Sequence, residues 1–287
     1  MSPASPSYVI KLSCPDGMGI VAGVSGFLAE QDCNITESSH FSDEITERFF
    51  MRTEFAPGSG TPALEHLEAT FSAIGSRFKM DWEIHDQSSA HRVMILVSKI
   101  DHCLNDLLYR YRTGKIAMEI PAIVSNHPDL KPLADFHSIP FHHLPVTSDT
   151  KPEQEAKLME LVEETGTELV VLARYMQVLT DNFCSKLAGR IINIHHSFLP
   201  SFKGAKPYHQ AHEKGVKLIG ATAHYVTPAL DEGPIIEQDT VRVSHVRTPE
   251  QMVELGSNIE NMVLARAVSY HLDHRVLLNG TKTVVFA

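Results

Sequence analysis

Several features of membrane and secreted proteins are missing from this chain of 287 residues. No run of about 18 apolar residues is present, which excludes a conventional membrane-spanning helix. The N-terminal segment lacks the basic start and the long apolar stretch of a secretory signal peptide. The cysteines are scattered without a CxxC pair, so we expect reduced thiols at Cys14, Cys33, Cys103 and Cys184. These absences predict a soluble cytoplasmic protein with no membrane partner.

Positive charge is also scarce. The chain carries 25 Lys and Arg against 35 Asp and Glu, a net charge of −10, which argues against a nucleic-acid partner. The acidity is uneven, because residues 1–88 hold 5 basic and 13 acidic side chains whereas residues 89–287 hold 20 and 22. A polar stretch at 86–90 separates the two parts. We therefore predict two domains, 1–88 and 89–287.

Histidine, in contrast, is abundant, with 17 residues. Because histidine ligates zinc and transfers protons, a metal-dependent amidohydrolase is one hypothesis. Surface and packing roles for most of these residues are the other. The adjacent His142 and His143 lie on a predicted strand, where their side chains point to opposite faces and make a poor chelate. We expect no metal site.

The first segment has the order strand–helix–strand–strand–helix–strand. An apolar strand at 8–12 ends in a turn at 15–17, and a helix follows with one apolar face at helical spacing, formed by Ile20, Val21, Val24, Phe27 and Leu28. Asp16 or a neighbour is expected to cap this helix. Strands are expected at 34–41, 47–55 and 79–85, and a second helix at 64–78. This order predicts a small ferredoxin-like βαββαβ domain.

The second segment alternates strands with helices. Strands are expected at 93–97, 120–124, 141–145 and 169–172, and helices at 103–112 and 152–164. Residues 93–97 are continuously apolar, which is typical of a strand buried on both faces. The alternation predicts an α/β domain with a doubly wound, Rossmann-like parallel sheet. Thr248 to Gln251 form a capping box that opens a long C-terminal helix.

The stretch 191–204 begins as a predicted strand and carries polar side chains where that strand ends. Asn193 and His195 are two residues apart, so they lie on the same side of the strand as it leaves the sheet, where open α/β sheets bind ligands. An amide donor and an imidazole together can stabilise an oxyanion and move a proton. Asp231, in the loop after 220–226, is a candidate to orient His195 and a water molecule. A cap role for Asn193 and a turn role for Asp231 are the structural alternatives.

The spans NIHHSFLPSFKG and GATAHYVTPALDEGPIIEQ closely resemble the folate-dependent formyltransferase family, with the resemblance covering about residues 91–285. The resemblance implies that Asn193, His195 and Asp231 form the catalytic triad. It also implies a strip for the pterin ring along Met176, Gln177, Val178 and Leu179. The loop at 227–231 corresponds to the one that closes over folate, with Thr227 and Leu230 as contacts. No cofactor is implied, because folate is the substrate.

The chain departs from the transferases of this family where they hold the acceptor. In the glycinamide-ribonucleotide transferases a glycine-rich loop after the first strand binds the acceptor phosphate, whereas residues 98–104 here contain no glycine. His196 replaces the proline that usually follows the catalytic histidine. An enzyme that holds the donor but cannot seat the amine should transfer the formyl group to water. His102 and His196 are further candidates for substrate binding.

In this respect the chain resembles the formyltetrahydrofolate deformylase family. That resemblance implies hydrolysis of 10-formyltetrahydrofolate to formate and tetrahydrofolate, which balances one-carbon pools and supplies formate for purine synthesis. Members of that family carry an N-terminal ACT domain, which residues 14–21 also resemble. An ACT domain implies an amino-acid effector between paired subunits of a homo-oligomer, a dimer or tetramer. The candidate effector contacts are Asp16, Gly17, Gly19 and Asn34.

Alternatives remain open for both parts of the chain. Asp16 and the nearby glycines also fit ordinary turn and cap chemistry. The second segment could belong to a formyltransferase with a small amine acceptor, to a non-catalytic sensor built on a transferase domain, or to the metal-dependent amidohydrolase considered above.

Overall fold

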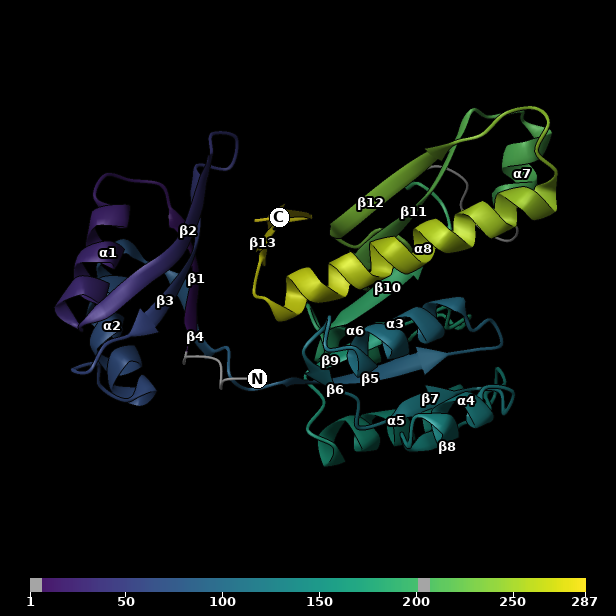
Figure 1. The fold of residues 1–287 in the computed structure, drawn as a ribbon, viewed down its shortest axis with the longest axis horizontal. Coiled ribbons are helices and arrows are strands. Elements are labelled where there is room, and N and C mark those ends of the chain that lie inside the picture. The colour runs from purple at the N-terminus through teal and green to yellow at the C-terminus, as the bar shows by residue number, and fades with distance from the viewer. Residues whose placement is uncertain (1–6, 201–206) are drawn as a thin grey trace. The chain divides into compact units, whose positions relative to one another are not determined.

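The computed structural model describes residues 7–200 and 207–287, so residues 201–204 of the 191–204 motif lie outside the described residues. The chain divides into two compact units (Figure 1). One contains residues 1–90 together with 273–287, and the other contains residues 91–272. The sequence places 273–287 in the second domain, whereas in the structure they pack with the first. The division after residue 90 is two residues from the predicted one.

The first unit has the predicted βαββαβ order followed by a C-terminal hairpin. Its elements are β1 (Tyr8–Pro15), α1 (Ile20–Glu30), β2 (Cys33–Asp43), β3 (Arg48–Pro57), α2 (Leu64–Phe78), β4 (Asp81–Asp86), β13 (Val276–Asn279) and β14 (Lys282–Val285). The antiparallel sheet has the order β2-β3-β1-β4. Phe71 of α2 joins the two helices to the sheet, because its ring meets Phe27 at 5.1 Å and Trp82 at 4.8 Å between centroids.

The loop between β1 and α1 shows which residue caps the helix. The N-cap of α1 is Gly19, with a φ of 87° and no side-chain hydrogen bond to the helix. Asp16 instead accepts a hydrogen bond from the backbone N–H of Gly17 at 2.8 Å. Of the two options expected from the sequence, a neighbour of Asp16 rather than Asp16 itself occupies the N-cap, and the Asp16 carboxylate stabilises a local turn.

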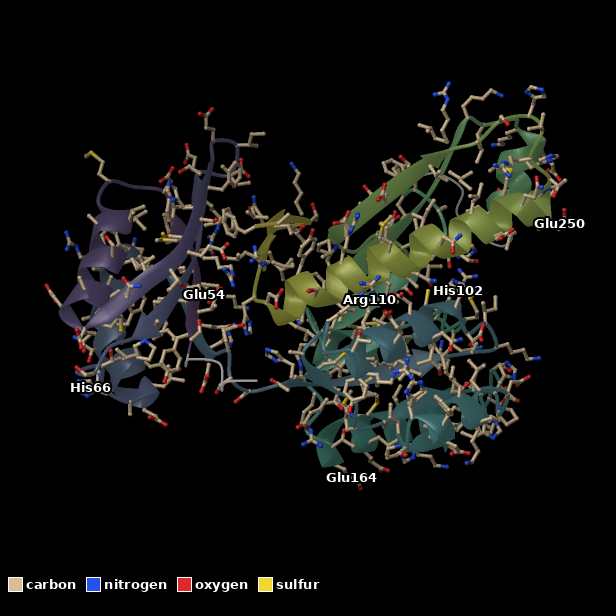
Figure 2. The ribbon with its side chains drawn as sticks, viewed as in Figure 1. Glu54, His66, His102, Arg110, Glu164 and Glu250 are labelled. Atoms are coloured by element: carbon tan, nitrogen blue, oxygen red, sulfur yellow. The ribbon has the colours of Figure 1, made fainter. Side chains whose placement is uncertain are left out.

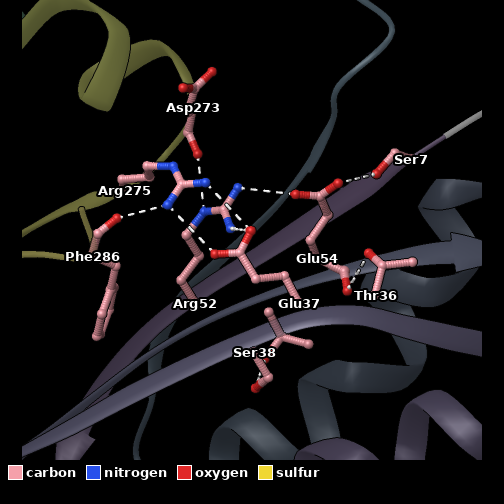
Figure 3. A network of polar contacts seen from close by, with 10 residues as sticks. Ser7, Thr36, Glu37, Ser38, Arg52, Glu54, Asp273, Arg275 and Phe286 are labelled. Atoms are coloured by element: carbon pink, nitrogen blue, oxygen red, sulfur yellow. Dashed lines mark hydrogen bonds and ion pairs between the residues drawn. The ribbon is translucent and has the colours of Figure 1, made fainter. Parts of the chain in front are cut away.

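The C-terminal hairpin is fixed to the first unit by a buried guanidinium (Figure 3). Arg52 of β3 is 2% exposed and donates from Nε to the backbone oxygen of Asp273 at 3.0 Å. Its Nη2 meets Glu54 at 3.3 Å, and Glu37 bridges Arg52 and Arg275. Because a buried guanidinium needs partners on several sides, these contacts bind the end of the chain to the sheet. This explains why 273–287 groups with residues far away in the sequence.

The second unit contains one large sheet and its covering helices. Its elements are β5 (His91–Val97), α3 (His102–Arg112), β6 (Met118–Glu119), β7 (Ile123–Ser125), α4 (Lys131–Phe136), β8 (Phe141–His143), α5 (Lys151–Glu164), β9 (Leu169–Leu172), α6 (Asp181–Lys186), β10 (Ile191–His195), α7 (Pro207–Glu213), β11 (Leu218–Tyr225), β12 (Ile235–Arg242) and α8 (Pro249–Leu272). Among the helices in the described parts of the chain, none is long and apolar enough to span a membrane.

The sheet runs in the order β12-β11-β10-β9-β5-β7-β8, with β6 pairing β5. The strands from β8 to β10 are parallel, as the alternation predicts, and β11 and β12 extend one edge in antiparallel fashion. Residues 93–97 of β5 are fully buried, which confirms that this strand is covered on both faces. Met94 and Leu96 pack in one core with Leu158 of α5 and Phe183 of α6.

The long helix α8 lies along β10, β11 and β12 and beside α3 (Figure 1). Its predicted capping box is confirmed by reciprocal hydrogen bonds: Gln251 N–H to Thr248 Oγ1 at 3.3 Å, and Thr248 N–H to Gln251 Oε1 at 3.1 Å. Most of its inward positions are apolar, but Glu260 is also buried, at 1% exposure. This carboxylate lies one turn after Gly256 and takes part in the site described next.

Candidate active site

A pocket of about 330 Å³ lies at the carboxyl ends of β9 and β10. Three segments form most of its lining, within 172–179 at the end of β9, 193–196 at the end of β10 and 224–231 from the end of β11 onward, and Cys184 of α6 adds to them. The structure brings together in this lining every residue predicted for catalysis or substrate contact except His102. These residues are Asn193, His195, Asp231, Met176, Gln177, Val178, Leu179, Thr227, Leu230 and His196. The position agrees with the rule that open α/β sheets bind ligands beyond their strand ends.

The side-chain amide of Asn193 is oriented by a histidine that the sequence did not single out. Asn193 pairs directly with His224 across the antiparallel β10–β11 ladder, and its Nδ2 lies 3.2 Å from His224 Nε2. His224 Nδ1 lies 2.9 Å from the backbone oxygen of Tyr225. A carbonyl oxygen can only accept, so Nδ1 carries the proton and donates to it. This leaves Nε2 to accept from Asn193. Burial lowers the pKa of His224, which favours this neutral form.

His195 and Asp231 form the second pair of the site. His195 Nδ1 lies 3.2 Å from Asp231 Oδ1, and His195 is 5% exposed. The hydrogen bond from His195 holds the pKa of Asp231 below its ordinary value despite partial burial, so this carboxylate is ionised near neutral pH. His195 Nε2 is buried and has no hydrogen-bond partner among the described residues. The geometry leaves this nitrogen to a ligand in the pocket.

The loop from 226 to 234 explains how Asp231 reaches His195. Asp231 has a φ of 56°, in the left-handed region that Asp tolerates better than most residues. Two residues later the chain passes against β11, where a Cβ on Gly233 would overlap the backbone oxygen of Tyr225. The backbone N–H of Tyr225 also donates to Pro234 O at 2.9 Å. Glycine at 233 is thus required to return the loop to the sheet with Asp231 above the pocket.

The pocket wall at 174–180 is fixed from two sides. Ser98 Oγ accepts from the backbone N–H of Met176 at 3.0 Å. Gln154 of α5 donates to the Tyr175 hydroxyl at 3.0 Å, and Glu155 accepts from the backbone N–H of Thr180 at 2.9 Å as well as from its hydroxyl. Met176 and Val178 remain 54% and 52% exposed between these anchors. Exposed apolar side chains on a fixed backbone suit the face of an aromatic ring.

His196 lines the pocket beside His195, with 5.3 Å between the two ring centroids. Burial, reinforced by the nearby charge of Arg174, lowers the pKa of His196 to about 4. The imidazole is therefore neutral near neutral pH and adds no positive charge to the pocket.

This low pKa makes the stability of the protein depend on pH. Between about pH 6.5 and 4 the unfolded chain binds a proton on His196 that the folded chain does not, so stability falls as the pH is lowered. We expect a free energy of unfolding about 1–2 kcal/mol smaller at pH 5 than at pH 7. Denaturant titrations of the wild type and of His196→Gln test this expectation. His224 acts in the same direction, so the variant should reduce the fall without removing it, and an equal fall in both proteins would contradict the assignment.

His102 is not among the residues that line the pocket. It begins α3, which lies beside α8 (Figure 2), and its Nε2 lies 2.9 Å from Oε2 of the buried Glu260. Tyr208 donates to Oε1 of the same carboxylate at 2.8 Å, and Arg174 Nε lies 3.5 Å from Oε2. The structure thus places the imidazole of His102 on the buried acid of α8 and outside the pocket lining, and its contact with substrate stays a prediction.

Glu260 is held as an anion by these neighbours. Burial raises its pKa, but the hydrogen bond from His102 and the charge of Arg174 outweigh burial, so the pKa lies below its ordinary value. Among the described residues, His102, Cys103 and Glu260 are the one group whose ligand atoms lie close enough to share a metal ion. The guanidinium of Arg174 on the same carboxylate opposes a further cation, so the donor set fits an ion-pair network better than a metal centre.

The four candidate effector residues lie in the first unit. Asp16, Gly17 and Gly19 occupy the exposed loop between β1 and α1, and Asn34 is an exposed residue at the start of β2. The backbone N–H of Asp16 donates to Glu47 O at 2.9 Å, which fixes the loop to the turn before β3.

Comparisons with known proteins agree with both units. Residues 91–268 match the formyl transferase family model, and residues 8–70 match the ACT domain model. The chain is 50% identical over 278 residues to formyltetrahydrofolate deformylase of Corynebacterium sp. (strain P-1), covering 97% of both chains. The solved formyltetrahydrofolate deformylase of Burkholderia mallei has a TM-score of 0.93 at 52% identity, covering 98% of this chain and 99% of that one.

A more distant solved structure matches part of the chain. Glycinamide ribonucleotide transformylase 1 of Symbiobacterium toebii has a TM-score of 0.66 at 28% identity and covers 71% of this chain and 97% of that one. The pocket geometry, the two domain matches and the nearly full-length relatives lead to one conclusion: the chain belongs to the formyltetrahydrofolate deformylase family.

Proposed function

We propose that this protein hydrolyses 10-formyltetrahydrofolate to formate and tetrahydrofolate, with Asn193, His195 and Asp231 as its catalytic residues. The observation that carries the proposal is the grouping of these three side chains around one pocket, with His195 Nε2 buried and without a partner among the described residues. The enzyme is a hydrolase of one-carbon metabolism, as its relatives are named.

Donor binding uses the fixed wall after β9. The pterin ring lies along Met176 to Leu179, and Thr227 and Leu230 approach from the loop after β11. The second unit, with 18 basic and 21 acidic side chains in 91–272, repels an anionic folate tail less than the acidic first unit would. These contacts place the formyl carbon beside Asn193.

The chemical step is attack of water on the formyl carbon. A C–O bond forms, and the tetrahedral oxyanion accepts hydrogen bonds from the Asn193 amide and from protonated His195. Asp231 stabilises the imidazolium and orients the water through its free oxygen, because its Oδ1 faces His195 Nδ1. The water proton passes through Asp231 to the folate nitrogen as the C–N bond breaks, leaving formate and tetrahydrofolate.

Water rather than an amine is the acceptor because the acceptor side of the site is occupied by the protein itself. The segment after β5 contains no glycine to receive a phosphate, and His102 at its end is tied to Glu260. Arg174 and Tyr208 meet the same carboxylate. His102, Tyr208 and Arg174 thus converge on the buried carboxylate of Glu260, and we infer that this cluster takes the place of the acceptor's phosphate.

Hydrolysis and formyl transfer to a small amine are separated by their products. We expect formate to be released from 10-formyltetrahydrofolate without any amine, at a rate that glycine, glycinamide or other small amines do not raise. A stopped assay that measures formate and formylated amine together tests this. Formate that appears only when an amine is present, or a formylated amine as the main product, would favour the transferase.

The proposed mechanism uses no metal and no redox cofactor. The oxyanion is stabilised by an amide and an imidazolium, and the proton moves between side chains, so no Lewis acid is needed. A cytoplasmic location accords with the free thiols of Cys14, Cys33, Cys103 and Cys184. We also propose that the formate serves purine synthesis and one-carbon balance.

The ACT unit is proposed to pair with a second copy and to bind an amino acid, with Asp16, Gly17, Gly19 and Asn34 as contacts and glycine or methionine as the first candidates. Its edge strand β2 has no partner on its outer side in the described residues and exposes Phe41, at 46%. We expect a dimer or tetramer by light scattering, and a shift of turnover or melting temperature when the effector is added. A monomer that responds to no amino acid would contradict this part of the proposal.

A further inference from the structure

The guanidinium of Arg174 lies buried in the pocket wall without hydrogen-bond acceptors for two of its nitrogens. Arg174 is 9% exposed and is one of the residues that line the pocket, together with Asn193 and His195. Its Nε and Nη1 have no acceptor among the described residues. Buried polar groups in folded proteins are nearly always hydrogen-bonded, and a buried cation with free donors is costly. The pocket is therefore short of an acceptor at this position.

Glu260 is the ion-pair partner of Arg174 but does not accept hydrogen bonds from it. Its Oε2 accepts from His102 at 2.9 Å and its Oε1 accepts from Tyr208 at 2.8 Å. Arg174 Nε lies 3.5 Å from Oε2, at the edge of hydrogen-bond distance and without the required alignment. The ion pair makes the buried guanidinium tolerable, and two of its nitrogens remain without an acceptor among the described residues.

The backbone keeps Arg174 in this place. Arg174 has a φ of 64°, which turns the chain sharply two residues after β9 ends. Its backbone oxygen accepts from the N–H of Ser98 at 3.3 Å, and the next residues are anchored by Ser98 Oγ and Gln154. The side chain therefore reaches the pocket from a rigid element, which is typical of a built binding site.

The guanidinium of Arg174, in a small and partly apolar pocket, indicates which class of ligand would bind there. A guanidinium offers a carboxylate two parallel N–H pairs, Nε with Nη2 and Nη1 with Nη2, and each pair of Arg174 contains one nitrogen that has no acceptor among the described residues. His196 is neutral and Asn193 is an amide, so the one charge in the wall beside the catalytic pair that favours an anion is Arg174. The proposed reaction turns a neutral formyl group into a small carboxylate inside this pocket.

We propose that Arg174 forms a product subsite that binds formate as it leaves the tetrahedral intermediate. This inference rests on the proposed hydrolysis. The neutral formyl group of the donor gains less from a guanidinium than the formate anion does, so the subsite favours the product side of the reaction. The charge of Glu260 offsets part of the attraction, which keeps binding weak enough for release. Formate at high concentration should consequently occupy the free enzyme and inhibit it.

The test is formate binding to the intact protein, measured by the melting temperature and by inhibition of turnover. Three matched ligands separate the causes: formate, formamide as the neutral isostere, and chloride at equal ionic strength. We expect a saturable rise of the melting temperature with formate alone. We also expect inhibition over the same concentration range. No formate-specific effect on the wild type would overturn the proposal.

Variants locate the effect. Arg174→Gln should weaken formate binding by about tenfold or more, because a charge-assisted hydrogen bond is lost. Arg266→Gln removes an exposed arginine that pairs with Asp239, and formate binding should be unchanged. If Arg174→Gln does not fold because Glu260 is left unpaired, the double variant Arg174→Gln with Glu260→Gln removes both charges and must also bind formate weakly.

Unchanged formate binding in either Arg174 variant overturns the subsite. Hydrolysis by the wild type without formate binding removes the subsite alone, whereas absence of hydrolysis removes the proposed function.

Discussion

Asp231→Asn is expected to lower turnover by about three orders of magnitude or more, while folate binding survives. The Asp231 carboxylate lies 3.2 Å from His195 Nδ1, and its lowered pKa keeps it negative near neutral pH. An amide has nearly the same shape but no charge to stabilise the imidazolium, and one of its ends is a donor that cannot accept the water proton. The loss should therefore appear in kcat, with the dissociation constant for a folate product little changed.

The control for this variant is Asp239→Asn. Asp239 lies on β12 and pairs with Arg266 at 3.1 Å, and it does not line the pocket, so turnover should stay near the wild-type value. The pH profile gives a second readout, because the lowered pKa of Asp231 keeps the required charged form down to pH values below the ordinary range of a carboxyl group. Near-normal turnover in Asp231→Asn would remove Asp231 from the mechanism.

Asn193→Ala is expected to lower kcat by about 10²–10³-fold, because it removes one donor to the oxyanion. The donor makes its strongest bond when the oxygen becomes charged, so KM should change little. Asn193→Asp should be at least as damaging, since it places an acceptor and a negative charge where a donor is needed. A variant that raised KM with kcat unchanged would show that Asn193 binds the ground state instead.

His224 offers a graded comparison for the same prediction. It is a positioning residue, which accepts from Asn193 Nδ2 at 3.2 Å while its Nδ1 donates to Tyr225 O. His224→Gln keeps one acceptor near the amide and should lower kcat by less than Asn193→Ala does. Adding His224→Gln to Asn193→Ala should cost almost nothing further in kcat, because the group that it positions is already absent.

Most of the fold could be predicted because its elements have strong local signals. The helix at 64–78 has the predicted bounds, and the capping box at 248–251 forms both of its hydrogen bonds. The continuous apolar run at 93–97 is buried throughout. In each case the pattern depends on residues within one element, so the sequence alone carries the information.

The parts that could not be predicted depend on contacts between distant residues. The hairpin at 273–287 joins the first unit through Arg52 and Arg275. The sequence of the hairpin itself does not indicate which sheet it packs against. β11 and β12 join the sheet in antiparallel fashion, and this direction depends on how the connecting segments return the chain rather than on the composition of either strand. The sequence left open whether Asp16 or a neighbour caps α1, and the structure has Gly19 there, with Asp16 accepting from the N–H of Gly17.

Some residues of the candidate site could be predicted from the sequence, and others could not. Period two along 191–195 places Asn193 and His195 together, and the resemblance to the formyltransferases supplied Asp231. His224 could have been found only by pairing 191–195 with 220–226, which sets it opposite Asn193. The sequence indicated Glu260 only weakly, as an acid between inward apolar positions of a long helix. Its contact with His102 could not be predicted without the tertiary structure.

The most direct test of the account is hydrolysis of 10-formyltetrahydrofolate in ¹⁸O-labelled water, without any amine and in the presence of a metal chelator. Water attack on the formyl carbon predicts formate and tetrahydrofolate in equal amounts over many turnovers, with one ¹⁸O atom in each formate. Formate that lacks the label, or release that stops until an amine or a metal is added, would contradict it.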